Sequence, residues 1–178
     1  RNVGHQRAIA IGINYAAEHL PDNTVVVMDS DGEDLPGTIK SLMQPLADPD
    51  VDVVVAHRKS RVETWRFRAF YLAYKWFFKL LSGRKISFGN FMALKPAAVK
   101  RLAAMQELWI HVAGCVLISK LRMVACPLDR GPRYAGHSKM NFVGLALHGF
   151  KGLMVFAEDV LVRVGIACAL VAVLSVIA

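Results

Sequence analysis

The feature that most constrains the fold is a short apolar run that ends in a cluster of acids. Residues 24–28 read Thr-Val-Val-Val-Met, and residues 29–34 read Asp-Ser-Asp-Gly-Glu-Asp. A short run of β-branched side chains that stops at turn residues is typical of a buried strand. Open α/β sheets bind their ligands at the carboxyl ends of the strands. The run therefore predicts a sheet with a charged site at one edge.

The acids that follow the strand favour a bound cation. Carboxylates gathered in one turn repel one another unless a cation neutralises them, and hard oxygen ligands suit Mg²⁺ or Mn²⁺, often together with substrate phosphates. We therefore interpret Asp29 and Asp31 as a metal and phosphate site. A solvated acidic turn is the alternative interpretation.

The rest of the chain alternates between helical and strand patterns. Apolar residues at helical spacing occupy 8–16, a helix is expected over 36–46, and a second buried strand over 51–56. This order is typical of an α/β fold with a mostly parallel sheet. Further along we expect a short strand, two helical stretches, another strand and an apolar helix, over residues 86–94, 96–105, 107–121, 123–128 and 142–162. A strand upstream of the first helix is expected in such a fold and is missing from the sequence.

Charge and hydropathy are distributed unevenly. The formal net charge is +8, and from residue 57 to residue 152 the only acids are Glu63, Glu107 and Asp129. Such a basic segment indicates an anionic partner, and the apolar tail that follows favours a membrane surface over nucleic acid. After Arg163 no residue is charged, which leaves fifteen residues where a spanning helix needs about 20. Since the chain also begins with Arg1, we expect a fragment that ends in the first part of a transmembrane helix. A buried core helix is the alternative.

The segment 62–81 is expected to form a basic, aromatic helix. At helical spacing, basic residues fall on one stripe and mainly aromatic residues on another: Arg61, Arg68, Lys75 and Lys79 on the first, and Phe67, Phe70, Tyr74, Phe77, Phe78 and Leu81 on the second. This pattern favours a helix in the membrane interface. Burial against the sheet and stacking on nucleic acid are the alternatives. The three cysteines form no C-x-x-C pair and fit a reducing compartment.

A second stretch that suits ligand chemistry covers residues 129–141. It contains Arg130, Arg133, Ser138, Lys139 and two glycines. Arginine grips phosphate through parallel hydrogen bonds, and glycine allows a close approach of the backbone, so the loop is a candidate anion clamp. A generic basic surface loop is the alternative.

Taken together, these motifs resemble the polyprenyl-phosphate glycosyltransferases of glycosyltransferase family 2, whose relatives include dolichol-phosphate mannose synthase. The run 29–34 looks like the family's D-x-D segment, and residues 2–8 look like its N-x-G-x-x-x-A segment. The tripeptide 89–91 is similar to the G-D-F turn, and residues 130–139 are similar to the acceptor-side R-x-x-R-x-x-G-x-S-K signature. The four motifs occur in the family's order and span nearly the whole chain.

The resemblance implies a GT-A fold, a Rossmann-like sheet with flanking helices. It implies a catalytic domain over 1–145 without its N-terminal strand, an interfacial amphipathic helix over 146–163 and the start of a transmembrane helix over 164–178. The catalytic domain would lie on the cytoplasmic side of the plasma membrane. A homo-oligomer is a further expectation, and nucleic acid is not expected as a partner.

The resemblance also implies roles for individual residues. A divalent metal, Mg²⁺ or Mn²⁺, would be held by Asp29, Asp31 and Glu33, and the nucleotide-sugar would contact Asp29, Asp31 and Asn90. The acceptor phosphate would be bound by Arg58, Arg61, Arg130, Arg133, Ser138 and Lys139. Asp31, Arg130 and Arg133 would serve catalysis directly. Two departures from the family pattern are the missing N-terminal strand, which weakens nucleotide binding by the chain as given, and Asn90 in place of an aspartate, which removes a candidate base.

The implied reaction transfers a hexosyl group, with inversion, from a nucleotide-sugar to a polyprenyl phosphate. A phosphate acceptor is already anionic at neutral pH and needs no strong base, whereas a hydroxyl acceptor would need one, with Glu107 or His111 as candidates. The alternatives are a processive or other hydroxyl-directed enzyme of the same family and a noncatalytic membrane-associated module. A haloacid-dehalogenase-type phosphatase fits less well, because Glu33 and Asp34 add repulsive charge to its nucleophile loop.

Overall fold

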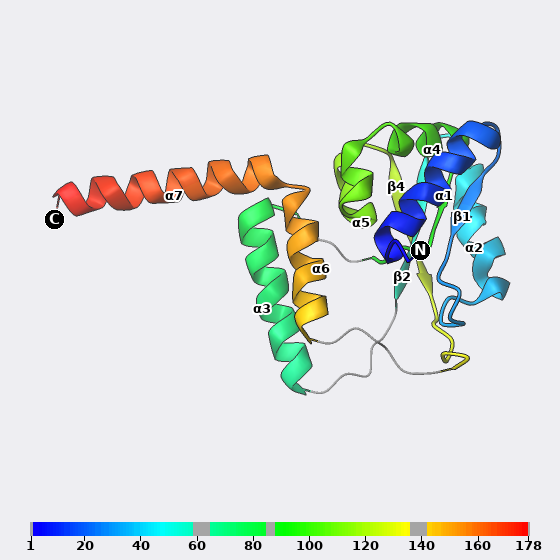
Figure 1. Ribbon diagram of the computed structural model, residues 1–178, viewed down its shortest axis with the longest axis horizontal. Helices are drawn as coiled ribbons and strands as arrows, with labels where there is room; N and C mark the ends of the chain where they lie inside the picture. The colour runs from blue at the N-terminus through cyan, green and yellow to red at the C-terminus, as the bar shows by residue number, and fades with distance from the viewer. Residues whose placement is uncertain (1, 59–64, 85–87, 136–141, 178) are drawn as a thin grey trace.

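The computed structural model describes residues 2–58, 65–84, 88–135 and 142–177, and its centre is a four-stranded mixed sheet (Figure 1). The strand order is β1-β3-β2-β4, with β1 at Val25–Val27, β2 at Val53–Arg58, β3 at Met92–Leu94 and β4 at Met123–Leu128. Strand β3 runs antiparallel to both β1 and β2, whereas β4 runs parallel to β2. Three strands therefore share one direction, and the α/β class expected from the sequence is confirmed, with β3 as the reversed strand.

The reversed direction of β3 decides which residues meet at the edge of the sheet. Strands β1, β2 and β4 end at one edge, and β3 begins there, since Val27 and Val55 both pair with Met92. The segments that follow β1 and β4 and the turn that precedes β3 therefore converge. These segments carry the acids of the first motif, the arginines of the last and the Gly-Asn-Phe turn.

One face of the sheet is covered by three helices. These are α1 (His5–His19), α4 (Pro96–Ala103) and α5 (Val112–Ile118), with the short 3₁₀ turn η3 (Gln106–Trp109) between the last two. Alternate strand residues point to opposite faces, so Val53 and Val55 pack under these helices while Val54 and Ala56 pack on the other side. The two covered faces explain why the continuous apolar run of β2 is buried. The edge strands differ from the expected buried strands, since β1 is half-buried and Met123 and Val124 of β4 are exposed.

The other face is covered by a broken helix rather than the continuous one expected over 36–46. It consists of η1 (Pro36–Thr38), α2 (Ile39–Met43) and η2 (Gln44–Ala47). Pro45 lacks the N–H that an α-helix needs and its ring clashes with the preceding turn, which accounts for the break before the last turn. Leu42 and Leu46 still fill the core on this side.

The remaining helices form a separate layer beside the sheet. Helix α3 (Trp65–Ser82) lies alongside α6 (Phe142–Met154), and α7 (Ala157–Ile177) projects away from both (Figure 1). The single helix expected over 142–162 is therefore wrong, because the chain breaks at Val155 and Phe156. Phe156 is 3% exposed and its ring packs edge-on against Phe78 of α3, with ring centroids 5.8 Å apart. This buried contact turns the chain between the two helices.

Helix α7 is long and apolar enough to cross a membrane, by length and composition. It has 21 residues and a mean hydropathy of 2.7, and none of its most apolar stretch is buried in the part of the protein that the structure describes. Among the described residues, this helix is therefore not part of a buried core. The helix runs unbroken through residue 163, so the division into an interfacial segment over 146–163 and a spanning segment over 164–178 stays a prediction.

Candidate functional site

The acidic turn after β1 is closed by one of its own carboxylates. The Asp29 backbone N–H donates to Asp34 Oδ2 at 2.9 Å, and Asp34 is 5% exposed. The Glu33 N–H donates to Asp31 Oδ1 at 3.1 Å, which tightens the turn in the way that aspartate side chains stabilise turns. Asp34 thus has a structural role here.

The basic loop after β4 is attached to this turn by backbone hydrogen bonds. The Gly131 N–H donates to the Glu33 carbonyl and the Tyr134 N–H donates to the Asp31 carbonyl, both at 2.9 Å. Gly32 has a φ of +90°, and a Cβ built on it would lie 2.6 Å from the Tyr134 ring. The turn therefore requires glycine at position 32 both for its backbone conformation and for the space that the ring occupies.

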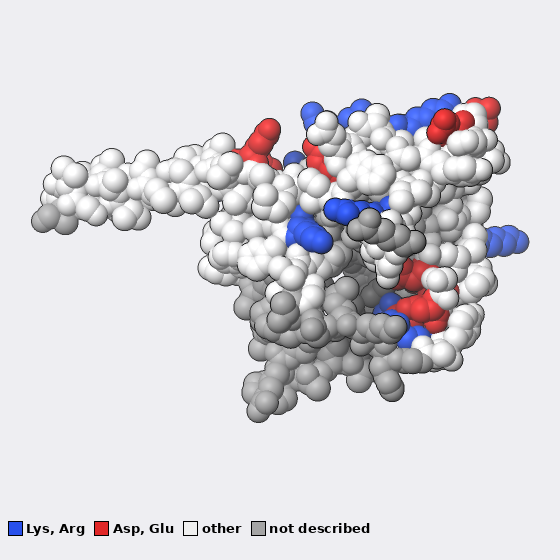
Figure 2. All heavy atoms as spheres, viewed as in Figure 1, with Lys and Arg blue, Asp and Glu red and all other residues white. Residues whose placement is uncertain are grey.

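Side-chain ion pairs join the two loops further. Arg133 Nη2 lies 2.9 Å from Asp31 Oδ2 and 3.4 Å from Glu33 Oε2, and Arg130 forms an ion pair with Glu33. Figure 2 shows acidic and basic atoms gathered together beside a hollow in the surface. Two residues predicted to hold the metal, Asp31 and Glu33, therefore meet two predicted to bind the acceptor phosphate, Arg130 and Arg133.

The site combines a cluster of carboxylates with two arginines. Asp31 and Glu33 form ion pairs with Arg133 and Arg130, and the partly buried Asp29 adds a third carboxylate to the turn. Burial lowers the pKa of Arg130 from its ordinary value, although the neighbouring carboxylates act against this. Carboxylates clustered in one turn are stabilised by a divalent ion.

The donor set fits Mg²⁺ or Mn²⁺ by chemistry, but its side chains are not arranged around one point. All the candidate ligand atoms are carboxylate oxygens, as these ions prefer. Among the described residues, no three His, Cys, Asp or Glu side chains converge as a ligand set, because Asp31 and Glu33 turn oxygens toward the arginines. Metal binding by Asp29, Asp31 and Glu33 therefore requires the guanidinium groups of Arg130 and Arg133 to move away from these carboxylates.

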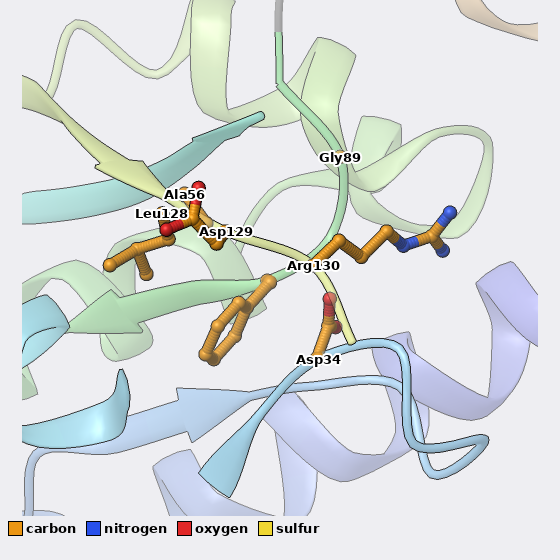
Figure 3. Close-up of a pocket in the computed structure, with 7 residues that line it drawn as sticks. Asp34, Ala56, Gly89, Leu128, Asp129 and Arg130 are labelled. Carbon is orange, nitrogen blue, oxygen red and sulfur yellow. The ribbon is translucent and has the colours of Figure 1, made fainter. Parts of the chain in front are cut away.

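A small pocket opens beside these loops (Figure 3). Its walls come from the ends of β2 and β4, the acidic turn and the turn before β3: Asp34, Ala56, Gly89, Phe91, Leu128, Asp129 and Arg130. In Figure 3 the carboxylate of Asp34 points toward the segment that carries Arg130. The pocket thus lies at the edge of the sheet where an open α/β fold binds ligands.

Asn90 lies in the turn before β3 and is held by the first turn of α1. Its Nδ2 is 2.7 Å from His5 Nε2, and its Oδ1 accepts a hydrogen bond from Gln6 Nε2 at 3.3 Å. His5 Nε2 is also 3.8 Å from Asp29 Oδ1. The sequence motifs alone do not single out His5 and Gln6, because both occupy variable positions of the N-x-G-x-x-x-A segment.

Several predicted site residues lie outside the described part of the chain. These are Arg61, Ser138 and Lys139, and for Arg58 the structure describes only the backbone at the end of β2. Of the residues assigned to the acceptor phosphate, the structure therefore places the side chains of Arg130 and Arg133.

The two candidate bases for a hydroxyl acceptor lie in η3 and at the start of α5. Glu107 is in the first turn of η3. His111 caps α5, because its Nδ1 accepts a hydrogen bond from the Gly114 N–H at 3.0 Å, and it is 6% exposed. Burial, aided by His148 at a ring distance of 4.7 Å, lowers the pKa of His111 to about 4. A buried imidazole engaged in a helix cap is poorly placed to take a proton from an acceptor.

Comparison with known proteins identifies the family. The model of glycosyl transferase family 2 matches residues 1–109, more than half of the chain, so the chain belongs to glycosyltransferase family 2. The loop with Arg130 and Arg133 lies beyond the matched residues.

Two curated relatives align with most of the chain. It is 29% identical over 166 residues to the uncharacterized glycosyltransferase sll0501 of Synechocystis sp. (strain ATCC 27184 / PCC 6803 / Kazusa), covering 88% of this chain and 49% of that protein. It is 28% identical over 163 residues to the uncharacterized glycosyltransferase YkcC of Bacillus subtilis (strain 168), covering 89% and 48%. The chain therefore spans about half the length of the curated relatives it matches.

Proposed function

We propose that this protein transfers a hexosyl group from a nucleotide-sugar to a polyprenyl phosphate at the cytoplasmic face of the plasma membrane. The observation that carries the proposal is the contact between the acidic turn and the basic loop, with Arg133 Nη2 2.9 Å from Asp31 Oδ2. A reaction between two phosphorylated substrates needs negative ligands for a metal and positive ligands for phosphate within one site. Family membership supports sugar transfer, and this pairing supports a phosphate acceptor.

On the donor side, Asp29, Asp31 and Glu33 hold Mg²⁺ or Mn²⁺, and Asn90 contacts the nucleotide-sugar. The ion would neutralise charge on the diphosphate leaving group. Asp29 and Glu33 are both partly buried in the same turn as Asp31.

On the acceptor side, Arg130 and Arg133 bind the lipid phosphate. In the ligand-free arrangement they pair with Glu33 and Asp31. If Asp31 and Glu33 held a cation instead, the guanidinium groups of Arg130 and Arg133 would be available to hold the acceptor phosphate against repulsion from the donor diphosphate. Arg58, Arg61, Ser138 and Lys139 are proposed to complete this side. Because the acceptor oxygen is already anionic, the reaction depends on positioning the two substrates more than on a strong base. An in-line attack would invert the configuration at the anomeric carbon.

The layer of helices α3, α6 and α7 is proposed to bring the lipid acceptor to this site. Large apolar side chains are exposed on α3 and α6 as well as on α7: Leu72, Trp76, Phe77 and Leu80 on α3, and Leu147, Phe150 and Met154 on α6. Lys75 and Lys79 are exposed on α3. Apolar and basic side chains on one surface suit the boundary between acyl chains and anionic headgroups. Within the described residues, Phe78 of α3 packs on Phe156 rather than on the sheet.

The test is a transfer assay on membranes that contain the natural protein with any flanking sequence it carries in the cell. Radiolabelled nucleotide-sugars are supplied with Mn²⁺ and polyprenyl phosphate, and sugar in the lipid extract is counted. We expect labelled lipid with at least one donor, and loss of about a hundredfold or more in Asp31→Asn, which removes a charge that holds the metal. Glu18→Gln, with an exposed side chain on α1, is the matched control.

Three results would contradict the proposal. Unchanged transfer in Asp31→Asn would remove the metal role. Transfer to an added sugar hydroxyl, with none to polyprenyl phosphate, would show that the protein is a hydroxyl-directed member of the family. Absence of any transfer, with the protein still bound to membranes, would favour the noncatalytic module.

A further inference from the structure

A chain of hydrogen bonds runs from a buried backbone group of α5 to the donor side of the site. The Val112 N–H donates to Gln6 Oε1 at 2.8 Å, and Gln6 Nε2 donates to Asn90 Oδ1 at 3.3 Å. Asn90 Nδ2 lies 2.7 Å from His5 Nε2, which lies 3.8 Å from Asp29 Oδ1. The neighbouring side chains of His5 and Gln6 on α1 and the distant side chain of Asn90 therefore form one continuous network.

The direction of every bond in this network follows from its first member. A backbone N–H can only donate, so Gln6 must turn its oxygen to Val112 and its NH₂ group to Asn90. Asn90 must then turn its oxygen to Gln6 and its NH₂ group to His5. The His5 Nε2 must accept, which puts the proton of the neutral ring on Nδ1.

The anchor of the network is rigid. Val112 is fully buried at the first position of α5, where helix N–H groups have no partner within the helix. An unpaired buried N–H costs free energy, so the Gln6 oxygen is held in place. This fixes the amide of Asn90 although Asn90 itself lies in a turn.

We propose that Gln6 is a positioning residue that makes Asn90 face the donor site with its N–H groups rather than its oxygen. The inference rests on the proposed function for the placement of the nucleotide-sugar beside Asn90 and Asp29. An amide NH₂ group binds an oxygen acceptor, so Asn90 recognises an oxygen of the nucleoside diphosphate.

The substitution that tests this is Gln6→Glu. The new carboxylate still accepts from the Val112 N–H, so the anchor survives, but it cannot donate to Asn90. Asn90 must rotate its NH₂ group toward residue 6 and its oxygen toward His5. Gln44→Glu, an exposed residue of η2, is a matched control with the same change of charge.

Two measurements on the detergent-solubilised protein decide the question. Nitrogen-15 NMR of the histidine rings is expected to show the His5 proton on Nδ1 in the wild type and on Nε2 in Gln6→Glu. Calorimetric titration with uridine diphosphate and guanosine diphosphate in Mn²⁺ is expected to show about tenfold weaker binding in Gln6→Glu of whichever nucleotide the wild type binds. Gln44→Glu should match the wild type in both, and both variants should keep the wild-type unfolding temperature.

The proposal is overturned by a wild-type His5 proton on Nε2, which requires no variant. It is also overturned if Gln6→Glu binds the nucleotide as the wild type does, or if the wild type binds neither nucleotide. A wild type that binds a nucleotide through this network but transfers no sugar to polyprenyl phosphate would contradict the proposed function and leave the role of Gln6 intact.

Discussion

Arg163 of α7 donates from Nη1 to the carbonyl oxygen of Leu80, at 3.4 Å, in the last turn of α3. Its guanidinium group occupies the space next to Gly83, where a Cβ would lie 2.5 Å from Nη2. Arg163 is the last charged residue before the uncharged end of the chain. The C-terminal end of a helix carries partial negative charge, so a cation there is stabilised. This contact joins the apolar helix to the layer beside the site.

We predict that Arg163→Leu loosens the end of α3. Loss of the contact removes a charge-assisted hydrogen bond, and the local opening free energy should fall by about 1 kcal/mol. Hydrogen exchange of the amides near Ser82 and Gly83 in detergent should therefore speed up severalfold. Arg163→Lys should restore part of the protection, because it keeps the cation. Equal exchange in all three proteins would show that the contact contributes nothing.

Arg133→Lys is predicted to impair transfer without unfolding the protein. Arginine reaches Asp31 and Glu33 together through its planar group, which a lysine ammonium cannot reproduce. We expect kcat/KM for the lipid acceptor to fall at least tenfold, about 1.4 kcal/mol of lost transition-state stabilisation, with a smaller change for the nucleotide-sugar. Arg7→Lys on α1 is the control. A wild-type kcat/KM in Arg133→Lys would remove the acceptor role.

Two glycine-to-alanine substitutions should have opposite effects. At Gly32 the positive φ and the Tyr134 ring both oppose a side chain, so Gly32→Ala should destabilise the protein by about 1–3 kcal/mol and separate the two loops. Gly12 lies inside α1 with open space around it, and alanine there should stabilise by up to about 1 kcal/mol. Thermal or denaturant unfolding measures both. Stabilisation by Gly32→Ala would contradict the observed turn.

His111 is predicted to make the fold sensitive to acid. Its folded pKa of about 4 lies below the ordinary 6.5, so the unfolded chain binds this proton first as the pH falls. Stability should therefore decline from about pH 6.5 to about pH 4, by at most roughly 3 kcal/mol, and this contribution should level off below pH 4. The pKa of His148 is also lowered by burial, so this residue contributes to the same loss of stability as the pH falls.

The substitution that isolates this effect is His111→Asn. Asparagine keeps an acceptor for the N-terminus of α5 but does not titrate in this range. Unfolding by denaturant at several pH values should show a shallower decline between pH 6.5 and pH 4 than in the wild type. His19→Asn, at an exposed position, should retain the wild-type slope. Parallel pH profiles for wild type and His111→Asn would refute the assignment.

The sequence by itself determined the fold class and the family, and it predicted one group of site residues. Buried strands appear as apolar β-branched runs because both faces of the sheet are covered, and local acid patterns reveal the turn with Asp29 and Asp31 because neighbours in sequence stay neighbours in space. The expected continuous helices over 36–46 and 142–162 were wrong. Pro45 interrupts the first, and Phe156 ends the second by entering a contact with Phe78.

Only the tertiary structure decided which distant residues meet. The reversed direction of β3 brings Asn90 to the edge where β1 and β4 end, and no local pattern reports strand direction or order. The pairing of Arg133 with Asp31 and the network from Val112 through Gln6 depend on that arrangement. Side-chain periodicity tells which face of an element is buried, whereas the partner across a sheet or between loops is chosen by packing of the whole chain.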